Sequence, residues 1–178
     1  HTFSGVEEGD TTQASAASTT ILTYRHTVPS YGQNKLLLVS LSLDANVTIT
    51  SVTFNGDSLT ELSTVGTSPK AAIYYRKEPD SVEGDVVITL NSASAISSGA
   101  TSFLYVDQTT TFGTAATSSG TGTSSSVTVV GASGRLNFDM LVKDGGSADG
   151  PAAGDDQSQI WLQYVSTTTS GAGSTVAS

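Results

Sequence analysis

The 178-residue chain contains no cysteine, which excludes disulfide bonds, cysteine-ligated zinc sites, iron–sulfur clusters and thiol catalysis. It is also poor in charge, because only 13% of its residues are Asp, Glu, Lys or Arg, whereas about 25% is typical of globular proteins. No apolar run approaches the roughly 20 residues that a membrane-spanning helix needs. We therefore expect no membrane insertion, and a core that is built without covalent cross-links.

Basic residues are scarcer than acidic ones, with 7 Lys and Arg against 16 Asp and Glu, so the net charge is -9 and the pI is near 4.3. An acidic surface repels nucleic-acid backbones and anionic membranes, which argues against both as partners. Ser and Thr supply roughly a third of the chain, so the surface is rich in hydroxyl groups rather than ions. This composition favours a protein of the extracellular space, the cell surface or the virion surface over a cytosolic enzyme.

Helix signals are nearly absent, and the chain is dominated by short runs of β-branched and aromatic residues between turn signals. Asn55-Gly56, between alternating apolar positions, is a strong hairpin signal because both central residues of a type I′ turn need positive φ. Glu7 to Asp10 indicates an acidic turn, and residues 166–178 are low in hydrophobicity. The expected strands lie within Thr19–Val28, Leu36–Leu43, Val47–Phe54, Leu59–Leu62, Ala72–Arg76, Asp85–Leu90, Gly99–Thr109, Val127–Val130, Leu136–Val142 and Ile160–Val165.

This spacing predicts an all-β fold, an antiparallel β-sandwich of jelly-roll or immunoglobulin-like kind with about eight to ten strands. Residues 1–178 suit a single domain. Within it, Gly99–Thr109 is expected to be a central strand that ends in a surface loop, with Phe103 and Val106 holding the two sheets together. Leu36–Leu43 is expected to be covered on both faces at its apolar start and on one face where serine alternates with leucine.

Several short motifs follow one another along nearly the whole sequence. In order they are Arg25–Val28, Asn34–Val39, Ser51–Gly56, Ile73–Tyr75, Gly84–Thr89, Ser102-Phe103, Val106–Gln108, Phe112–Thr114 and Gln157–Trp161. This order resembles a family of secreted β-sandwich modules. That family is known from large surface proteins of bacteria and archaea and from phage structural proteins, mostly without an assigned activity, and the resemblance implies no catalytic residues for this chain.

The chain departs from that family in one respect. Members of the family usually continue beyond a segment like Gly171–Thr175 into one or two further strands, whereas the sequence stops at Ser178. A sandwich that lacks a strand exposes an apolar groove and unpaired backbone groups. Two readings stay open: a neighbouring subunit supplies the strand, as in donor-strand complementation, or the rest of the chain lies outside this sequence.

Candidate chemistry is sparse. His26 is the only internal histidine, and no Gly-x-Ser-x-Gly motif accompanies it, so we expect a structural role for it and no catalytic residues. A Gly-rich acidic segment offers oxygen ligands of the kind that calcium prefers, without EF-hand spacing. The candidate calcium ligands are Asp144, Asp149, Asp155 and Asp156, and the alternative is a plain polar loop. No other cofactor is expected.

Two further residues are candidates for surface recognition. Asn46 begins an Asn-Val-Thr sequon near a turn, which is a glycosylation acceptor if the host glycosylates surface proteins. Tyr31 follows Pro29 in a loop and is the aromatic residue expected to be exposed, so it is a candidate glycan contact. The favoured function is a non-enzymatic filament subunit, adhesin module or virion decoration protein. Its partners would be copies of itself or another surface protein, and the alternative is a carbohydrate-binding module.

Overall fold

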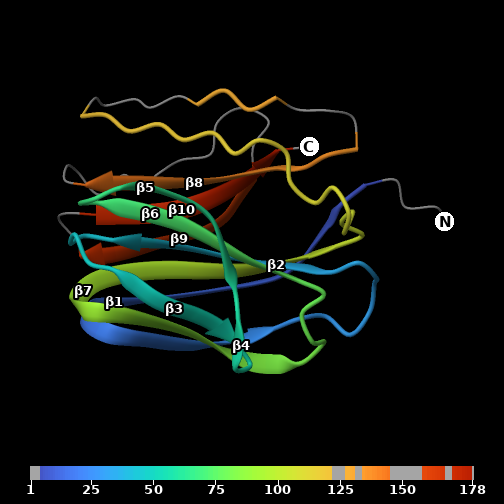
Figure 1. The fold of residues 1–178 in the computed structure, drawn as a ribbon, viewed down its shortest axis with the longest axis horizontal. Coiled ribbons are helices and arrows are strands. Elements are labelled where there is room, and N and C mark those ends of the chain that lie inside the picture. The colour runs from blue at the N-terminus through green and yellow to red at the C-terminus, as the bar shows by residue number, and fades with distance from the viewer. Residues whose placement is uncertain (1–4, 122–126, 131–133, 145–157, 167–169, 178) are drawn as a thin grey trace.

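The described part of the chain consists of antiparallel β-strands joined by loops and contains no helix (Figure 1). The computed structural model describes residues 5–121, 127–130, 134–144, 158–166 and 170–177, with side chains described up to Lys143 and at Gln159 and Ile160. The all-β prediction is confirmed. The strands are β1 (Glu7–Thr27), β2 (Leu36–Leu43), β3 (Ile49–Phe54), β4 (Asp57–Ser58), β5 (Thr60–Gly66), β6 (Lys70–Lys77), β7 (Glu83–Leu104), β8 (Asn137–Asp144), β9 (Ser158–Ser166) and β10 (Ser170–Ala177).

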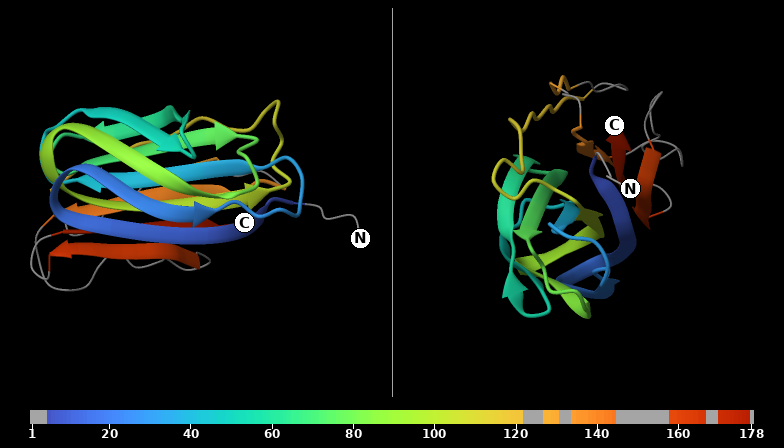
Figure 2. Two further views of the ribbon diagram at one scale, coloured as in Figure 1. Left: turned by 90° about the horizontal axis from the view of Figure 1, so that it is seen from below. Right: turned by 90° about the vertical axis from the view of Figure 1, so that its right-hand side faces the viewer.

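A seven-stranded sheet forms the main body, with the order β4-β3-β7-β2-β6-β5 and with β1 along β7. The 22-residue β7 pairs with β3 through its first half and with β2 through its second half, while β1 follows it along both halves. Register shifts in β1 between Ala16 and Ile21 mark the bend. The sheet therefore curls nearly round on itself (Figure 2), and the predicted sandwich is not confirmed, because one bent sheet supplies both walls of the core.

The main core lies inside this bend. Alternate residues of β2, namely Leu37, Val39, Leu41 and Leu43, are each 0% exposed and face apolar residues of β3 and of the first half of β7. The alternation of side chains along a strand sends Leu36, Leu38, Ser40 and Ser42 to the opposite face. We expected that face to be open at its serine end, but Ser40 and Ser42 are buried as well, because a second sheet covers it.

The second sheet has the order β8-β10-β9 and packs on the outer face of β1, β2, β6 and β7. Phe103, near the end of β7, and Val106, just after it, cluster there with Leu36 and Leu38 of β2. Leu136, Phe138 and Ile160 pack against this outer cluster from the second sheet and the residue before it. The prediction that Phe103 and Val106 join two sheets is therefore confirmed.

Some of the predicted turns and strands are confirmed and others are wrong. The Asn55-Gly56 hairpin is confirmed, because Asn55 has φ 51° and Gly56 has φ 88° between β3 and β4. The acidic turn at Glu7 to Asp10 is wrong, since these residues begin β1 and pair with the end of β7. The low-hydrophobicity segment 170–177 forms β10, the middle strand of its sheet. Val127–Val130 was expected to be a strand, but it has no strand structure.

Candidate functional site

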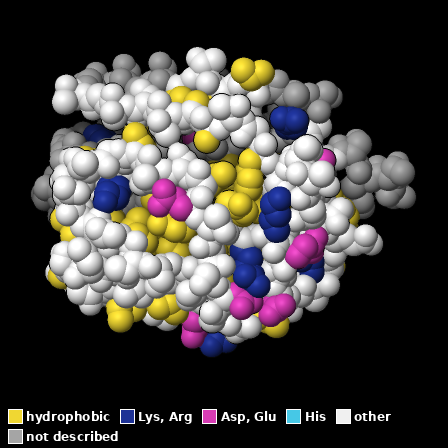
Figure 3. All heavy atoms as spheres, viewed as in Figure 1, with side chains coloured by type: hydrophobic (Ala, Val, Ile, Leu, Met, Phe, Trp, Pro, Cys, Tyr) yellow, Lys and Arg dark blue, Asp and Glu magenta, His cyan; other side chains and the backbone are white. Residues whose placement is uncertain are grey.

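A groove of about 1260 Å³ lies between the seven-stranded sheet and β8. One wall is the outer face of β2, β5 and β6, and the other is β8 with the residues just before it. The loop after β7 and the segment Val127–Val130 run along its rim. In the space-filling view, hydrophobic side chains gather at the centre of this face beside a hollow (Figure 3). The groove is thus formed by segments that are far apart in the sequence.

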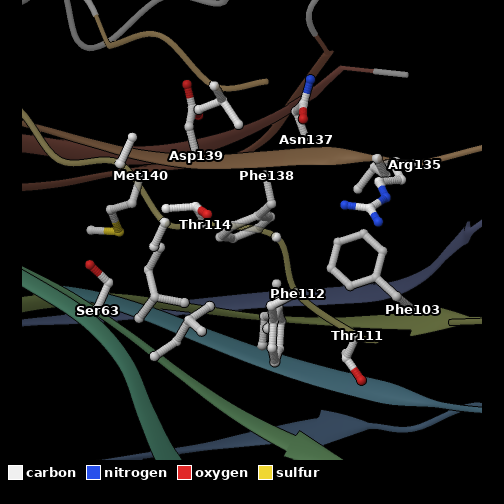
Figure 4. A pocket seen from close by; sticks show the side chains of 18 of the residues that line it. Ser63, Phe103, Thr111, Phe112, Thr114, Arg135, Asn137, Phe138, Asp139 and Met140 are labelled. Atoms are coloured by element: carbon white, nitrogen blue, oxygen red, sulfur yellow. The ribbon is translucent and has the colours of Figure 1, made fainter. Parts of the chain in front are cut away.

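Aromatic rings line the interior of the groove. The rings of Phe103 and Phe138 meet edge to face with centroids 6.0 Å apart. Phe112 also lines the groove, and its ring meets that of Tyr75, beneath it, at 4.7 Å. Figure 4 shows Phe138 directed down from β8 towards Phe112, with Met140 beside it. Edge-to-face pairs are favourable by about 0.5–1.5 kcal/mol beyond burial of their area, so the Phe103–Phe138 pair stabilises the contact between β8 and the end of β7.

Arg135 projects over this aromatic cluster. Its guanidinium extends towards the ring of Phe103 in Figure 4, and a Cβ on Gly113 would lie 3.4 Å from its Nη1. Within the described residues Arg135 has no hydrogen bond or ion pair, whereas the chain's other cations are all bonded. Arg25 pairs with Glu83 and Arg76 with Asp57. Lys35 donates to Pro29, Lys70 to Val47 and Lys77 to Gln108, and Lys143 also has an interaction partner. The charged residues that line the groove are Asp107, Asp139 and Arg135, of which Arg135 is the positive one.

β5 borders the groove and is the last strand of its sheet, so its outer backbone edge is unpaired within the described part of the chain. Proteins usually protect such edges with lysine, proline or bulges. β1, the other long edge strand, has three register irregularities. β5 has one, between Glu61 and Ser63, and the residues from Ser63 to Gly66 pair regularly with β6 and include no Lys or Pro. This short edge is open to pairing with another strand.

His26 does not line the groove and is buried between the two halves of the bent sheet. Its Nδ1 lies 2.9 Å from Thr12 Oγ1, and its Nε2 lies 2.7 Å from Ser102 Oγ. His26 is 1% exposed and Ser102 is 0% exposed, so this histidine–serine pair leaves no room for a substrate. Burial lowers the pKa of His26 to about 4, although the charge of Asp10 opposes this shift. The ring is therefore neutral at pH 7 and bridges the two halves.

Two buried or half-buried tyrosines also hydrogen-bond inside the fold. The hydroxyl of Tyr24 lies 2.8 Å from Ser98 Oγ, and burial raises its pKa well above the usual value. The hydroxyl of Tyr74 donates to Glu61 Oε2 at 3.0 Å, and burial followed by the nearby carboxylate raises its pKa too. These rings are explained by packing, as expected for aromatic residues in strands.

The sequence-predicted site residues are scattered. Asn46 is exposed in the loop between β2 and β3, and Tyr31 is 64% exposed in the loop between β1 and β2, as expected. Asp144 ends β8, but its side chain and the residues Asp149, Asp155 and Asp156 lie outside the described part. Among the residues that are described, no group of three or more acidic or histidine side chains could hold a metal ion. The calcium site stays a prediction.

The sequence predicted an apolar groove only in general terms, for a sandwich that lacks a strand, and did not predict the residues that line this one. One signal was present, because Arg135 is the only charged residue between Asp107 and Asp139. Comparisons with protein families, with characterised proteins and with solved structures found no match to this chain.

Proposed function

We propose that the protein is a non-enzymatic structural protein of an extracellular, cell or virion surface, and that it assembles through its strand edges. The groove bordered by the open edge of β5 carries this proposal. An added strand needs unpaired backbone groups for its hydrogen bonds and apolar pockets for alternate side chains, and this site offers both. Filament subunit, adhesin module and virion decoration protein are all compatible with such assembly. The β-sandwich description and the resemblance to secreted surface modules stay part of the proposal.

Size favours a polypeptide segment over a small molecule. Pockets for small ligands usually measure about 300–1000 Å³, and the groove exceeds this range at about 1260 Å³.

A non-enzymatic role is supported by the burial of the histidine–serine pair, which is the one such arrangement seen among the described side chains. The described residues also include no helix long and apolar enough to cross a bilayer.

Microscopy and mass measurement of the purified protein test the proposal. We expect oligomers or fibres by negative-stain electron microscopy, and a mass above 18.1 kDa that grows with concentration by light scattering. A single species of monomer mass at all concentrations would contradict assembly.

A carbohydrate-binding module is the second candidate, and the exposed ring of Tyr31 favours it. A flat ring with about two thirds of its surface free can stack on a sugar face. This reading predicts a monomer that is retained on a glycan array, with retention lost in Tyr31→Ala and kept in Tyr31→Trp. Equal retention of the wild type and Tyr31→Ala would remove Tyr31 as the contact.

A further inference from the structure

We propose that the groove receives the Val127–Val130 segment of a second copy of this chain, which adds as a strand to the open edge of β5. This inference rests on the proposed assembly through strand edges and names the partner and the segment. Three observations carry it: the state of the segment, the state of the edge and the distribution of charge.

Val127–Val130 has the composition of a strand without the structure of one. Three of its four residues are valine and the fourth is threonine, which are strong β-formers. The segment nevertheless forms no strand, and the side chains of Val127, Val129 and Val130 are 43%, 43% and 89% exposed. An apolar, β-prone segment left exposed is a favourable site for pairing with another chain.

The complementary edge lies on the same molecule. Ser63 and Val65 of β5 line the groove, and their strand has a free backbone edge within the described residues. Both sides of the proposed contact border one groove, yet within one copy Val127–Val130 forms no ladder with β5. In a pair of copies, the Val127–Val130 segment of each copy can pair with the β5 edge of the other, because each copy presents both.

Charge permits a second copy at this place. Each copy carries a net charge of -9, so most approaches between copies are repulsive. The residues from Thr109 to Gly134 include no charged side chain, and Arg135 next to them is positive. The Val127–Val130 segment therefore brings no negative charge to the groove of another copy, which Arg135 lines together with Asp107 and Asp139.

The absence of cysteine allows a direct test by disulfide trapping. Val129→Cys is mixed with a mass-tagged Ser63→Cys, so a mixed disulfide can form only between copies. The control pair is Val129→Cys with Thr20→Cys, whose exposed position on β1 lies outside the groove. We expect the 129–63 pair to cross-link about tenfold more than the control pair, which corresponds to about 1.4 kcal/mol of preferential contact.

Two results would overturn the inference. One is equal cross-linking of the two pairs, and the other is a disulfide within single chains of the double variant Ser63→Cys, Val129→Cys, since the segment would then cover its own β5. Neither result contradicts assembly through another edge, such as β1. A wild type that stays monomeric by light scattering would contradict both the inference and the proposed function.

A second variant tests the strand pairing itself. Val129→Pro removes a backbone donor and disfavours a strand, so we expect association to weaken about tenfold. Ser119→Pro, at an exposed position in the same uncharged stretch, serves as the control and should associate like the wild type. Association of Val129→Pro at wild-type strength would also overturn the inference.

Discussion

Buried polar side chains connect the two halves of the bent sheet at the level of single residues. His26 is one of them, because its neutral ring can donate to one hydroxyl and accept from the other, between Thr12 and Ser102. Its ring also meets Phe54 edge to face at 6.1 Å. A protonated ring would donate to both hydroxyls but place a charge in the core, where desolvation is costly. The fold therefore depends on the protonation state of this residue.

Acid should destabilise the protein through His26. The pKa of its ring falls from 6.5 to about 4 on folding, so between these values the unfolded chain binds a proton that the folded chain does not. The stabilising contribution is fully present above pH 6.5 and is lost as the pH falls towards 4, by about 3 kcal/mol in total. Urea unfolding of the wild type and His26→Gln at pH 4 to 7 measures it. We expect the free energies of unfolding to converge as the pH falls, whereas parallel curves would contradict this account.

Gly66 ends β5 in a conformation that a side chain would strain. Its φ is +77°, and an added Cβ would lie 2.3 Å from the carbonyl oxygen of Pro69. We expect Gly66→Ala to lower the free energy of unfolding by about 2 kcal/mol or more. Gly120→Ala is the control, because no atom lies within 4 Å of its added Cβ, and it should change stability by about 0.5 kcal/mol at most. Thermal unfolding of both variants compares them, and equal stabilities would contradict the expected strain.

At the scale of elements, β2 is the strand on which both packed faces depend. Its odd-numbered leucines face the main core, and its even-numbered residues lie beneath the second sheet. Cross-strand pairing with β6 and β7 fixes this alternation, because a one-residue slip would exchange the two faces. Removing a side chain from β2 therefore leaves a cavity that neighbouring strands cannot easily fill.

The substitution Leu41→Ala tests this packing. It is 0% exposed, so Leu41→Ala should cost about 3 kcal/mol through lost burial and the remaining cavity. Val130→Ala removes an apolar side chain that is 89% exposed and should leave the stability of the monomer within about 0.5 kcal/mol of the wild type. Urea unfolding at low protein concentration measures both. A similar loss in the two variants would mean that Val130 is buried in solution.

Local signals predicted the elements that local chemistry decides. β2 was predicted with its observed bounds, and the Asn55-Gly56 turn followed from its need for positive φ. Elements that depend on distant partners were not predictable. β10 has weak strand propensity and is a strand because β8 and β9 pair with both its edges, whereas Val127–Val130 has strong propensity and lacks a described partner.

The candidate site was harder to predict than the fold for the same reason. The walls of the groove come from β2, β5, β6 and β8, and only the curvature of the sheet brings them together. Phe112 and Phe138, which face each other across the groove in Figure 4, are separated by a stretch that gives no sequence signal for their contact. The exposure of Tyr31 and Asn46 was predictable, because each follows from a local turn.

At the scale of the whole molecule, charge opposes self-association while one surface permits it. A net charge of -9 on 178 residues keeps copies apart at low ionic strength. The groove rim carries a long uncharged stretch and Arg135, whose guanidinium has no bonded partner among the described residues. The electrostatic repulsion between copies acts over a distance that salt shortens. The ionic strength therefore decides whether repulsion or association through the groove rim prevails.

Assembly should therefore strengthen with salt. The Debye length falls from about 30 Å at 0.01 M to about 8 Å at 0.15 M ionic strength, which screens repulsion between whole copies more than it weakens contacts through uncharged strands. We expect the light-scattering mass at fixed protein concentration to rise over this range of NaCl. Arg135→Glu should associate more weakly than the wild type at 0.01 M and approach it at 0.15 M, since the variant adds repulsion at the rim. Association that weakens as salt is added would instead indicate an interface held by ion pairs, and would contradict assembly through the uncharged rim and the edge of β5.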